Sequence, residues 1–348
     1  MNKNKNLTSE NTFLLAIKKH RENNLKEAQN YYQKVLEINP NHVNAHNNLG
    51  VIFKDLGENQ KAKSCFEKAI KTNPNYADTH YNLGIVFKNL GEHQKAKDCY
   101  EKVIKLNPNH APAHNNLGAI FKNLGEHQKA KDYYEKAIEI DPSYINAHNN
   151  LGAIFNKLGE YLKAKDCYEK VIKLNPNHTP AHNNLGAIFN KLGEYLKAKI
   201  CYEKAIEIDP NYTDAHYNLG IVFKNLGEHQ KAKDCYEKVI KLNPNHAPAH
   251  NNLGAIFKNL GEHQKAKDYY EKAIEIDPSY INAHNNLGAI FHELGEHQKA
   301  VSCYEKAIEI NPSYADAHNN LGAIFHELGE HQKAVSCYEK AIEIDPSY

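Results

Sequence analysis

The chain has 348 residues, of which 43 are basic and 42 acidic, so its formal net charge is only +1. Because both signs are spread along the whole sequence, no basic arm is present, and we expect no nucleic-acid partner. No apolar run approaches the ~18 residues that a membrane-spanning helix needs, and Phe13 to Ile17 is too short for a signal peptide. These features predict a cytoplasmic protein with no membrane partner.

Taken in chain order, the sequence is a tandem repeat with a period of 34 residues. Met1–Thr8 is predicted to be a disordered leader, and residues 9–42 form a degenerate first repeat that suits an N-terminal cap. Nine complete repeats follow, at 43–76, 77–110, 111–144, 145–178, 179–212, 213–246, 247–280, 281–314 and 315–348. One such repeat is too short to sustain its own core, so repeats must bury their apolar faces on each other.

Each repeat is predicted to be a pair of helices. In repeat 77–110, apolar residues recur at helical spacing up to Leu90, and Gly91 then ends the first helix. A second apolar stripe ends before Pro108, after which Asn109, or Ser143 one repeat later, is the expected N-cap of the next helix.

Prolines at the start of some first helices fit this pattern. Pro112, Pro180 and Pro248 fall in the first turn, where proline costs little. Gly84 lies inside a first helix, where glycine costs about 1 kcal/mol relative to alanine. We expect close approach of the two helices to offset that cost, with small residues such as Ala96 opposite the glycine.

A residue's place is counted from the first residue of its repeat. The repeats carry Leu-Gly at places seven and eight, an aromatic at eleven, Gly at fifteen, Ala at twenty, Tyr at twenty-four, Ala or Val at twenty-seven and Pro at thirty-two. This pattern resembles the tetratricopeptide repeat family over residues 9–348. The resemblance implies an all-α, right-handed superhelical solenoid of ten helix-turn-helix repeats, with a concave groove lined by the first helices.

Two departures from the family pattern lead to further expectations. Place four is His in all nine complete repeats, where the family often has a large aromatic. The family's usual polar helix after the last repeat is missing, so part of the apolar face formed by Tyr338, Ile342 and Ile344 is expected to be exposed. Such a face would allow end-to-end self-association through the C-terminal repeat.

Reactive residue types are explained by repeat places. The seven cysteines occupy place twenty-three, where other repeats have Tyr, and are expected to be reduced packing residues. The place-four histidines are too far apart to share a metal ion and are expected to be structural. In the segment His292 to His297, Gly295 puts the two histidines on different helices, so it is not a zincin motif. We expect no metal, no cofactor and no catalytic residue.

The places that a hairpin core does not need indicate binding. Place six is asparagine in every complete repeat: Asn48, Asn82, Asn116, Asn150, Asn184, Asn218, Asn252, Asn286 and Asn320. Place five adds Asn115, Asn149 and Asn183, and place twelve adds Lys88 and Lys122. An amide offers both a donor and an acceptor, so a row of amides suits the backbone of an extended peptide. The row is similar to that in the repeat arm of O-linked N-acetylglucosamine transferases.

A plainer interpretation of the row remains open. Asparagine at place six is a habit of the repeat family, and residues 80–155 are identical to 216–291, so copied repeats are not independent observations. We predict a non-enzymatic scaffold that binds extended peptide segments of partner proteins in its groove. The alternatives are the substrate-binding arm of a larger enzyme, such as a glycosyltransferase of the type just named, and a self-stacking assembly module.

Overall fold

The computed structural model describes residues 8–347, and over that range the chain is all-α, with twenty helices and no strand. The leader predicted as disordered lies outside the described residues except for Thr8, whose hydroxyl accepts the N–H of Asn11 at 3.3 Å and caps the first helix. The chain divides into two compact units, one ending at Pro176 and one beginning at Asn177.

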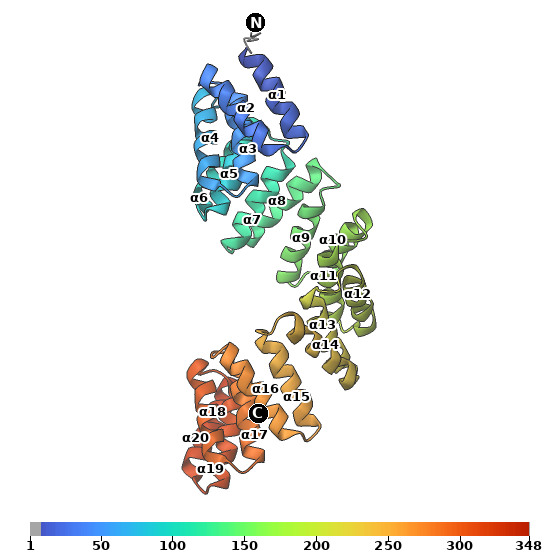
Figure 1. Ribbon diagram of the computed structural model, residues 1–348. Coiled ribbons are helices and arrows are strands. Elements are labelled where there is room, and N and C mark those ends of the chain that lie inside the picture. The colour runs from blue at the N-terminus through green and yellow to red at the C-terminus, as the bar shows by residue number, and fades with distance from the viewer. Residues whose placement is uncertain (1–7, 348) are drawn as a thin grey trace. The chain divides into compact units, whose positions relative to one another are not determined.

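The first unit contains five helical hairpins (Figure 1). They are α1 (Ser9–Arg21) with α2 (Leu25–Ile38), α3 (Val43–Asp55) with α4 (Asn59–Thr72), α5 (Ala77–Asn89) with α6 (His93–Leu106), α7 (Ala111–Asn123) with α8 (His127–Ile140), and α9 (Ile145–Lys157) with α10 (Tyr161–Leu174).

The second unit contains five more hairpins (Figure 1). They are α11 (Thr179–Lys191) with α12 (Tyr195–Ile208), α13 (Thr213–Asn225) with α14 (His229–Leu242), α15 (Ala247–Asn259) with α16 (His263–Ile276), α17 (Ile281–Glu293) with α18 (His297–Ile310), and α19 (Ala315–Glu327) with α20 (His331–Ile344). The predicted pairing of two helices in each repeat is confirmed.

The turn inside each hairpin is set by place fifteen. Helix α5 ends at Asn89, and Gly91 follows with φ +75°, a left-handed conformation that glycine adopts at little cost. In the degenerate first repeat the same place is held by Asn23, with φ 57°. The predicted stop signal is therefore correct, and asparagine can replace glycine in it.

The predicted N-caps are wrong by one residue. First helices begin at place one, so the capping residue is place thirty-four rather than Asn109 or Ser143 at place thirty-three. At α7, Nδ1 of His110 accepts the N–H of Ala113 at 3.1 Å. The N–H of Asn109 instead bonds Oδ1 of Asn107 at 3.2 Å, and this local turn leads the chain into the cap.

The glycine at place eight lies against a buried aromatic ring. A Cβ on Gly84 would lie 2.6 Å from Cε1 of Tyr100, and Tyr100 is fully buried. Close approach was predicted correctly, but the partner differs: the glycine faces the flat ring of Tyr100 at place twenty-four, not small residues such as Ala96. A ring needs more room than a methyl group, which explains why glycine outweighs its unfavourable helix propensity here.

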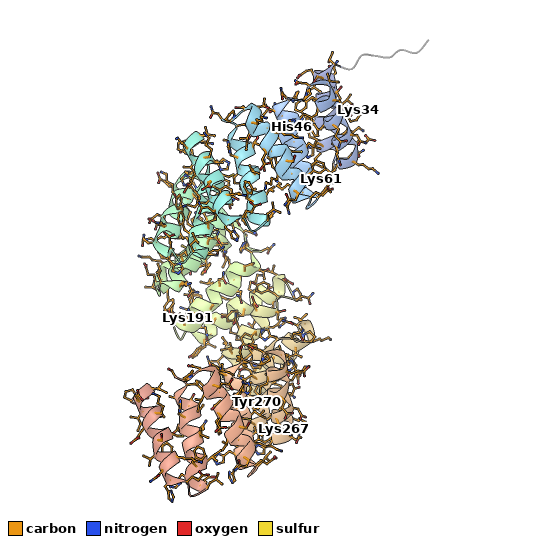
Figure 2. The ribbon with its side chains drawn as sticks, turned by 90° about the vertical axis from the view of Figure 1, so that its left-hand side faces the viewer. Lys34, His46, Lys61, Lys191, Lys267 and Tyr270 are labelled. Atoms are coloured by element: carbon orange, nitrogen blue, oxygen red, sulfur yellow. The ribbon has the colours of Figure 1, made fainter. Side chains whose placement is uncertain are left out.

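Within each unit the second helix of one repeat packs on the first helix of the next, as α16 packs on α17. Tyr270, labelled in Figure 2, is buried in this stack, with 1% of its surface exposed. Nearby, the ammonium of Lys267 lies 5.5 Å from the ring centroid of Phe291 in the next repeat. This contact adds a cation–π attraction of about 0.5–1 kcal/mol between repeats.

The last helix, α20, exposes apolar side chains as predicted. Ile342 is 48% exposed, and Tyr338 and Ile344 are half-buried, whereas Tyr304, which matches Tyr338 one repeat earlier, is 1% exposed. Val335 on the same helix is 54% exposed.

Candidate functional site

The place-six asparagines lie along the first helices, and we call them the asparagine row. In the first unit the row consists of Asn48, Asn82, Asn116 and Asn150, and in the second of Asn184, Asn218, Asn252, Asn286 and Asn320. All nine side chains are half-buried. Each is thus both held by the protein and open to solvent.

Hydrogen bonds between repeats hold the row in place. In the second unit, Nδ2 of Asn218 donates to Oδ1 of Asn183 at 3.0 Å, and Asn286 and Asn320 make the same bond to Asn251 and Asn285 at 2.9 and 3.0 Å. In the first unit, Asn150 donates to Asn115 at 3.0 Å. In these four cases an amide of the row bonds the place-five residue of the preceding repeat, 35 residues earlier. Asn48 instead donates to the hydroxyl of Tyr32 at 3.3 Å.

The place-five asparagines lie beneath the row. Asn115 is 6% exposed and Asn183 is 7% exposed, while Asn149 is half-buried. Where place five is tyrosine, the hydroxyl takes over the acceptor role, since Asn116 donates to Tyr81 at 3.5 Å and Asn252 to Tyr217 at 3.4 Å. Burial raises the pKa of both tyrosines, so their hydroxyls stay neutral.

Asn82 departs from the pattern for an identifiable reason. Place three of its repeat is Thr79 instead of the usual alanine, and the Thr79 hydroxyl donates to Oδ1 of Asn47 at 3.0 Å. Asn82 is approached by Lys54, whose ammonium lies 3.3 Å from its Oδ1. Place twelve of one repeat thus borders the row in the next. The predicted site lysines at that place differ in burial: Lys88 is exposed and Lys122 half-buried.

The place-four histidines attach each first helix to the loop before it. Nε2 of His148 lies 3.0 Å from the carbonyl oxygen of Pro142, at the end of the preceding repeat. The same bond, at 2.8–3.0 Å, is made by His46, His80, His114, His216, His250, His284 and His318. Burial lowers the pKa of His46 and His250. These bonds support the structural role expected for the histidines.

The cysteines are also packing residues. All seven are free thiols, and Cys65, Cys99, Cys167 and Cys201 are buried. Burial raises the pKa of Cys99 to about 12, so its thiol is a weak nucleophile at neutral pH.

A hollow of about 640 Å³ in the described surface is lined by the loop residues Pro40 and Asn41 together with His46 and Lys68, and by none of the asparagines of the row. The row is an open strip, which suits an elongated ligand better than a compact one.

One pair of histidines is arranged differently from what the sequence predicted. His292 and His297 are on separate helices, as expected, but the turn between α17 and α18 brings their ring centroids within 5.9 Å. Nε2 of His292 also lies 2.9 Å from Oε2 of Glu327 in the next repeat. Gly295 therefore puts the two histidines on different helices, as expected, but the tight turn folds the helix ends together and brings the two rings close.

Three features of the site were missed at the level of sequence: the burial of place five, the capping by place thirty-four, and the approach of Glu327 to His292. A signal for the first two exists, since place five varies only between Asn and Tyr in the complete repeats and place thirty-four only between His and Tyr. Asn, Tyr and His all carry a polar group on a short stem or a ring, and such a group can make a hydrogen bond inside the protein.

Comparison with known families gives a consistent result. Models described as tetratricopeptide repeat match residues 43–76, 77–110, 111–144, 145–178, 167–200, 213–246, 245–313 and 279–347, and one described as TPR repeat matches 19–57 and 186–227. Together the matched ranges run from residue 19 to residue 347. None of the curated proteins matches the chain. No helix among residues 8–347 is long and apolar enough to cross a membrane.

Solved structures resemble the fold. Yeast Tom70 is 14% identical with a TM-score of 0.51, covering 97% of this chain and 92% of its own. The pilF protein of Pseudomonas aeruginosa is 22% identical with a TM-score of 0.53, covering 58% and 92%. YrrB, described as a TPR protein with an unusual peptide-binding site, is 27% identical with a TM-score of 0.45, covering 54% and 96%.

Proposed function

Because the chain belongs to the tetratricopeptide repeat family, we propose that it is a non-enzymatic scaffold that binds extended segments of partner proteins along the asparagine row. The observation that carries this proposal is the half-exposed amide at place six of all nine complete repeats. We also propose a cytoplasmic location, because seven free thiols fit a reducing compartment.

The hydrogen bonds between repeats support recognition of a peptide backbone. An asparagine amide has two N–H donors and one carbonyl acceptor. The bond from Asn218 to Asn183 uses one N–H, so the same amide carries a second N–H and a carbonyl group. Since the first bond already fixes the side chain, less conformational entropy is lost when a ligand binds.

The surroundings of the row favour backbone recognition over recognition of charge. Place nine is half-buried and small or apolar, as in Ile85 and Ala119, and provides a non-polar floor. Lys88 and Lys122 add positive charge beside the row in the first unit, where we propose that they contact acidic side chains of the partner. In this proposal the place-five residues Asn115 and Asn183 hold amides of the row from beneath, whereas the Oδ1 atom of Asn149 has no hydrogen-bond partner among the described residues.

A peptide array compares two matched sets of variants in the second unit. Asn218→Ala, Asn286→Ala and Asn320→Ala together remove three amides of the row. The second set, Asn183→Ala, Asn251→Ala and Asn285→Ala, removes the acceptors of the same three hydrogen bonds but leaves the amides of the row in place. At about 0.5–1.5 kcal/mol per ligand hydrogen bond, the first set is expected to lose at least ~10-fold in affinity.

The second set controls for changes in stability and is expected to retain most of the binding. Circular dichroism on both proteins checks that the helices are intact. Equal capture of peptides by the two sets, or unchanged capture by the first, would contradict the proposed role of the row.

A second role, self-association, is favoured by the exposed apolar side chains of α20, among them Val335 and Ile342. Burying such side chains contributes about 25 cal/mol per Å² of apolar surface. Sedimentation velocity of the wild type and of Val335→Lys/Ile342→Lys tests this role. A monomer that does not change with concentration in the wild type would rule it out.

A further inference from the structure

Three side chains that belong to two repeats converge in the second unit. His292 is in the last turn of α17, His297 is the first residue of α18, and Glu327 is the last residue of α19. Nε2 of His292 lies 2.9 Å and Nδ1 of His297 lies 4.0 Å from Oε2 of Glu327. One nitrogen from each histidine and one carboxylate oxygen all lie within 4.8 Å of one another.

These separations are close to those of a metal site. Imidazole nitrogen and carboxylate oxygen bind Zn²⁺ at about 2.0–2.2 Å, which puts tetrahedral ligand atoms ~3.3–3.6 Å apart. The observed separations of 2.9 and 4.0 Å lie on either side of this range. The two histidines are half-buried and Glu327 is exposed, so small side-chain rotations can bring all three atoms into range.

The state of the individual groups also suits a cation. Nδ1 of His297 is buried and has no hydrogen-bond partner among the described residues. An unpartnered nitrogen beside a carboxylate and a second imidazole is an arrangement that a metal ion satisfies.

Neighbouring repeats show which part of the arrangement is special. Nδ1 of His127 is equally without a hydrogen-bond partner among the described residues, so this feature is not confined to the cluster. One repeat before the cluster, Glu293 lies 3.1 Å from Lys258 and 3.3 Å from His263. There an ammonium stands where His292 stands in the cluster, and a protonated lysine repels a cation instead of ligating it.

The copied segment gives the same contrast in sequence. Residues 80–155 and 216–291 are identical, and the identity ends immediately before His292. At the places of His292, His297 and Glu327, the first copy is followed by Asn156, Tyr161 and Lys191. His292 and Glu327 thus have no counterparts of the same residue type after the first copy, whereas histidine at place seventeen also occurs in other repeats, as in His127.

We propose that His292, His297 and Glu327 form a binding site for one divalent transition-metal ion, with Zn²⁺ as the best match. Two imidazoles and a carboxylate are ligands that Zn²⁺ accepts, and three protein ligands leave one tetrahedral position for water or another ligand. This site is independent of the proposed peptide binding.

Titration with Co²⁺, which absorbs visible light in a tetrahedral site, tests the proposal on full-length protein freed of metal by a chelator. The wild type is expected to bind one Co²⁺ ion tightly per chain, and Zn²⁺ is expected to displace that ion. His292→Lys copies the arrangement at Lys258 and is expected to weaken this binding at least ~100-fold, since even supporting residues of metal sites contribute 10–100-fold. Lys258→His rebuilds the cluster one repeat earlier and is expected to raise the stoichiometry to two.

His326→Asn is the control, because it removes a histidine of the neighbouring pair without adding a charge beside Glu327. His326 and His331 also lie close together, with ring centroids 5.6 Å apart, but the only three-ligand group among the described residues is the one at Glu327. This variant is expected to bind like the wild type. A tight equivalent that persists in His292→Lys, a wild type that binds no Co²⁺ tightly, or a stoichiometry that stays at one in Lys258→His would each overturn the proposal.

Discussion

Replacing Gly118 by alanine sets two effects of opposite sign against each other. Alanine favours a helix interior by about 1 kcal/mol over glycine. The new Cβ, however, would lie 2.7 Å from Cε1 and 2.8 Å from Cδ1 of Tyr134. Tyr134 is 0% exposed, so its ring cannot move into solvent. Overpacking costs about 1–3 kcal/mol, and we expect a net loss of ~1 kcal/mol in the free energy of unfolding.

The same hairpin contains a control for backbone effects. A Cβ on Gly125 meets no atom within 4 Å, but its φ of +78° disfavours alanine by about 1–2 kcal/mol. Gly125→Asn is expected to cost less than Gly125→Ala, because Asn23 already adopts φ 57° at that place. The two glycines thus resist alanine for different reasons, one steric and one conformational.

Urea unfolding followed by circular dichroism measures these differences, and amide hydrogen exchange in α7 measures the local part. The first repeat has Ala16 at place eight, opposite Tyr32, so Gly118→Ala is expected to fold. If Gly118→Ala raised the free energy of unfolding by ~1 kcal/mol, helix propensity alone would explain it. The argument that the tyrosine ring leaves no room for a Cβ at place eight would then be refuted.

Three further predictions concern titration and an unpaired hydroxyl. Burial raises the pKa of the thiols of Cys99, Cys167 and Cys235 to about 12, whereas the pKa of an unfolded thiol is about 8.5. The melting temperature is therefore expected to fall as pH rises above ~9, because the unfolded state loses thiol protons first. A melting temperature that does not change over this pH range would contradict the prediction. Burial lowers the pKa of His46, so its contribution to the free energy of unfolding is present above pH ~6.5 and is lost as the pH falls. Thermal melts between pH ~7 and ~5 check this, and the melting temperature of His46→Ala is expected to depend less steeply on pH than that of the wild type. The Tyr134 hydroxyl is buried and has no hydrogen-bond partner among the described residues. Tyr134→Phe introduces the residue that Phe66 already provides at place twenty-four, and it is expected to leave the free energy of unfolding unchanged or raise it by up to ~1 kcal/mol. A loss of more than ~1 kcal/mol in urea unfolding would show that the hydroxyl has a hydrogen-bond partner.

The sequence predicts those features that depend on one repeat alone. The place-fifteen glycine ends the first helix, and the apolar spacing gives two helices in each repeat, because both are local consequences of backbone conformation and side-chain period. The N-cap was misplaced because histidine is rarely a capping residue, and only the structure places Nδ1 of His110 at the N–H of Ala113.

Features that depend on two repeats are harder to predict. Asn183 is buried because Asn218, 35 residues later, covers it and donates to it, and no spacing within one repeat contains that information. Glu327 meets His292 and His297 for the same kind of reason. Both contacts depend on how one first helix lies beside the next, which is set by the packing of the helices between them.

The bonds that Asn218, Asn286 and Asn320 donate each join two neighbouring repeats, so this part of the row also responds to bending. A change in the angle between neighbouring repeats changes the distance from Asn286 to Asn251, which is 2.9 Å in the structure. If a peptide binds best to amides at that spacing, it favours one angle, and reciprocity requires that bending the chain changes its affinity. Mechanical tension applied to the two ends of the protein would then release a bound partner.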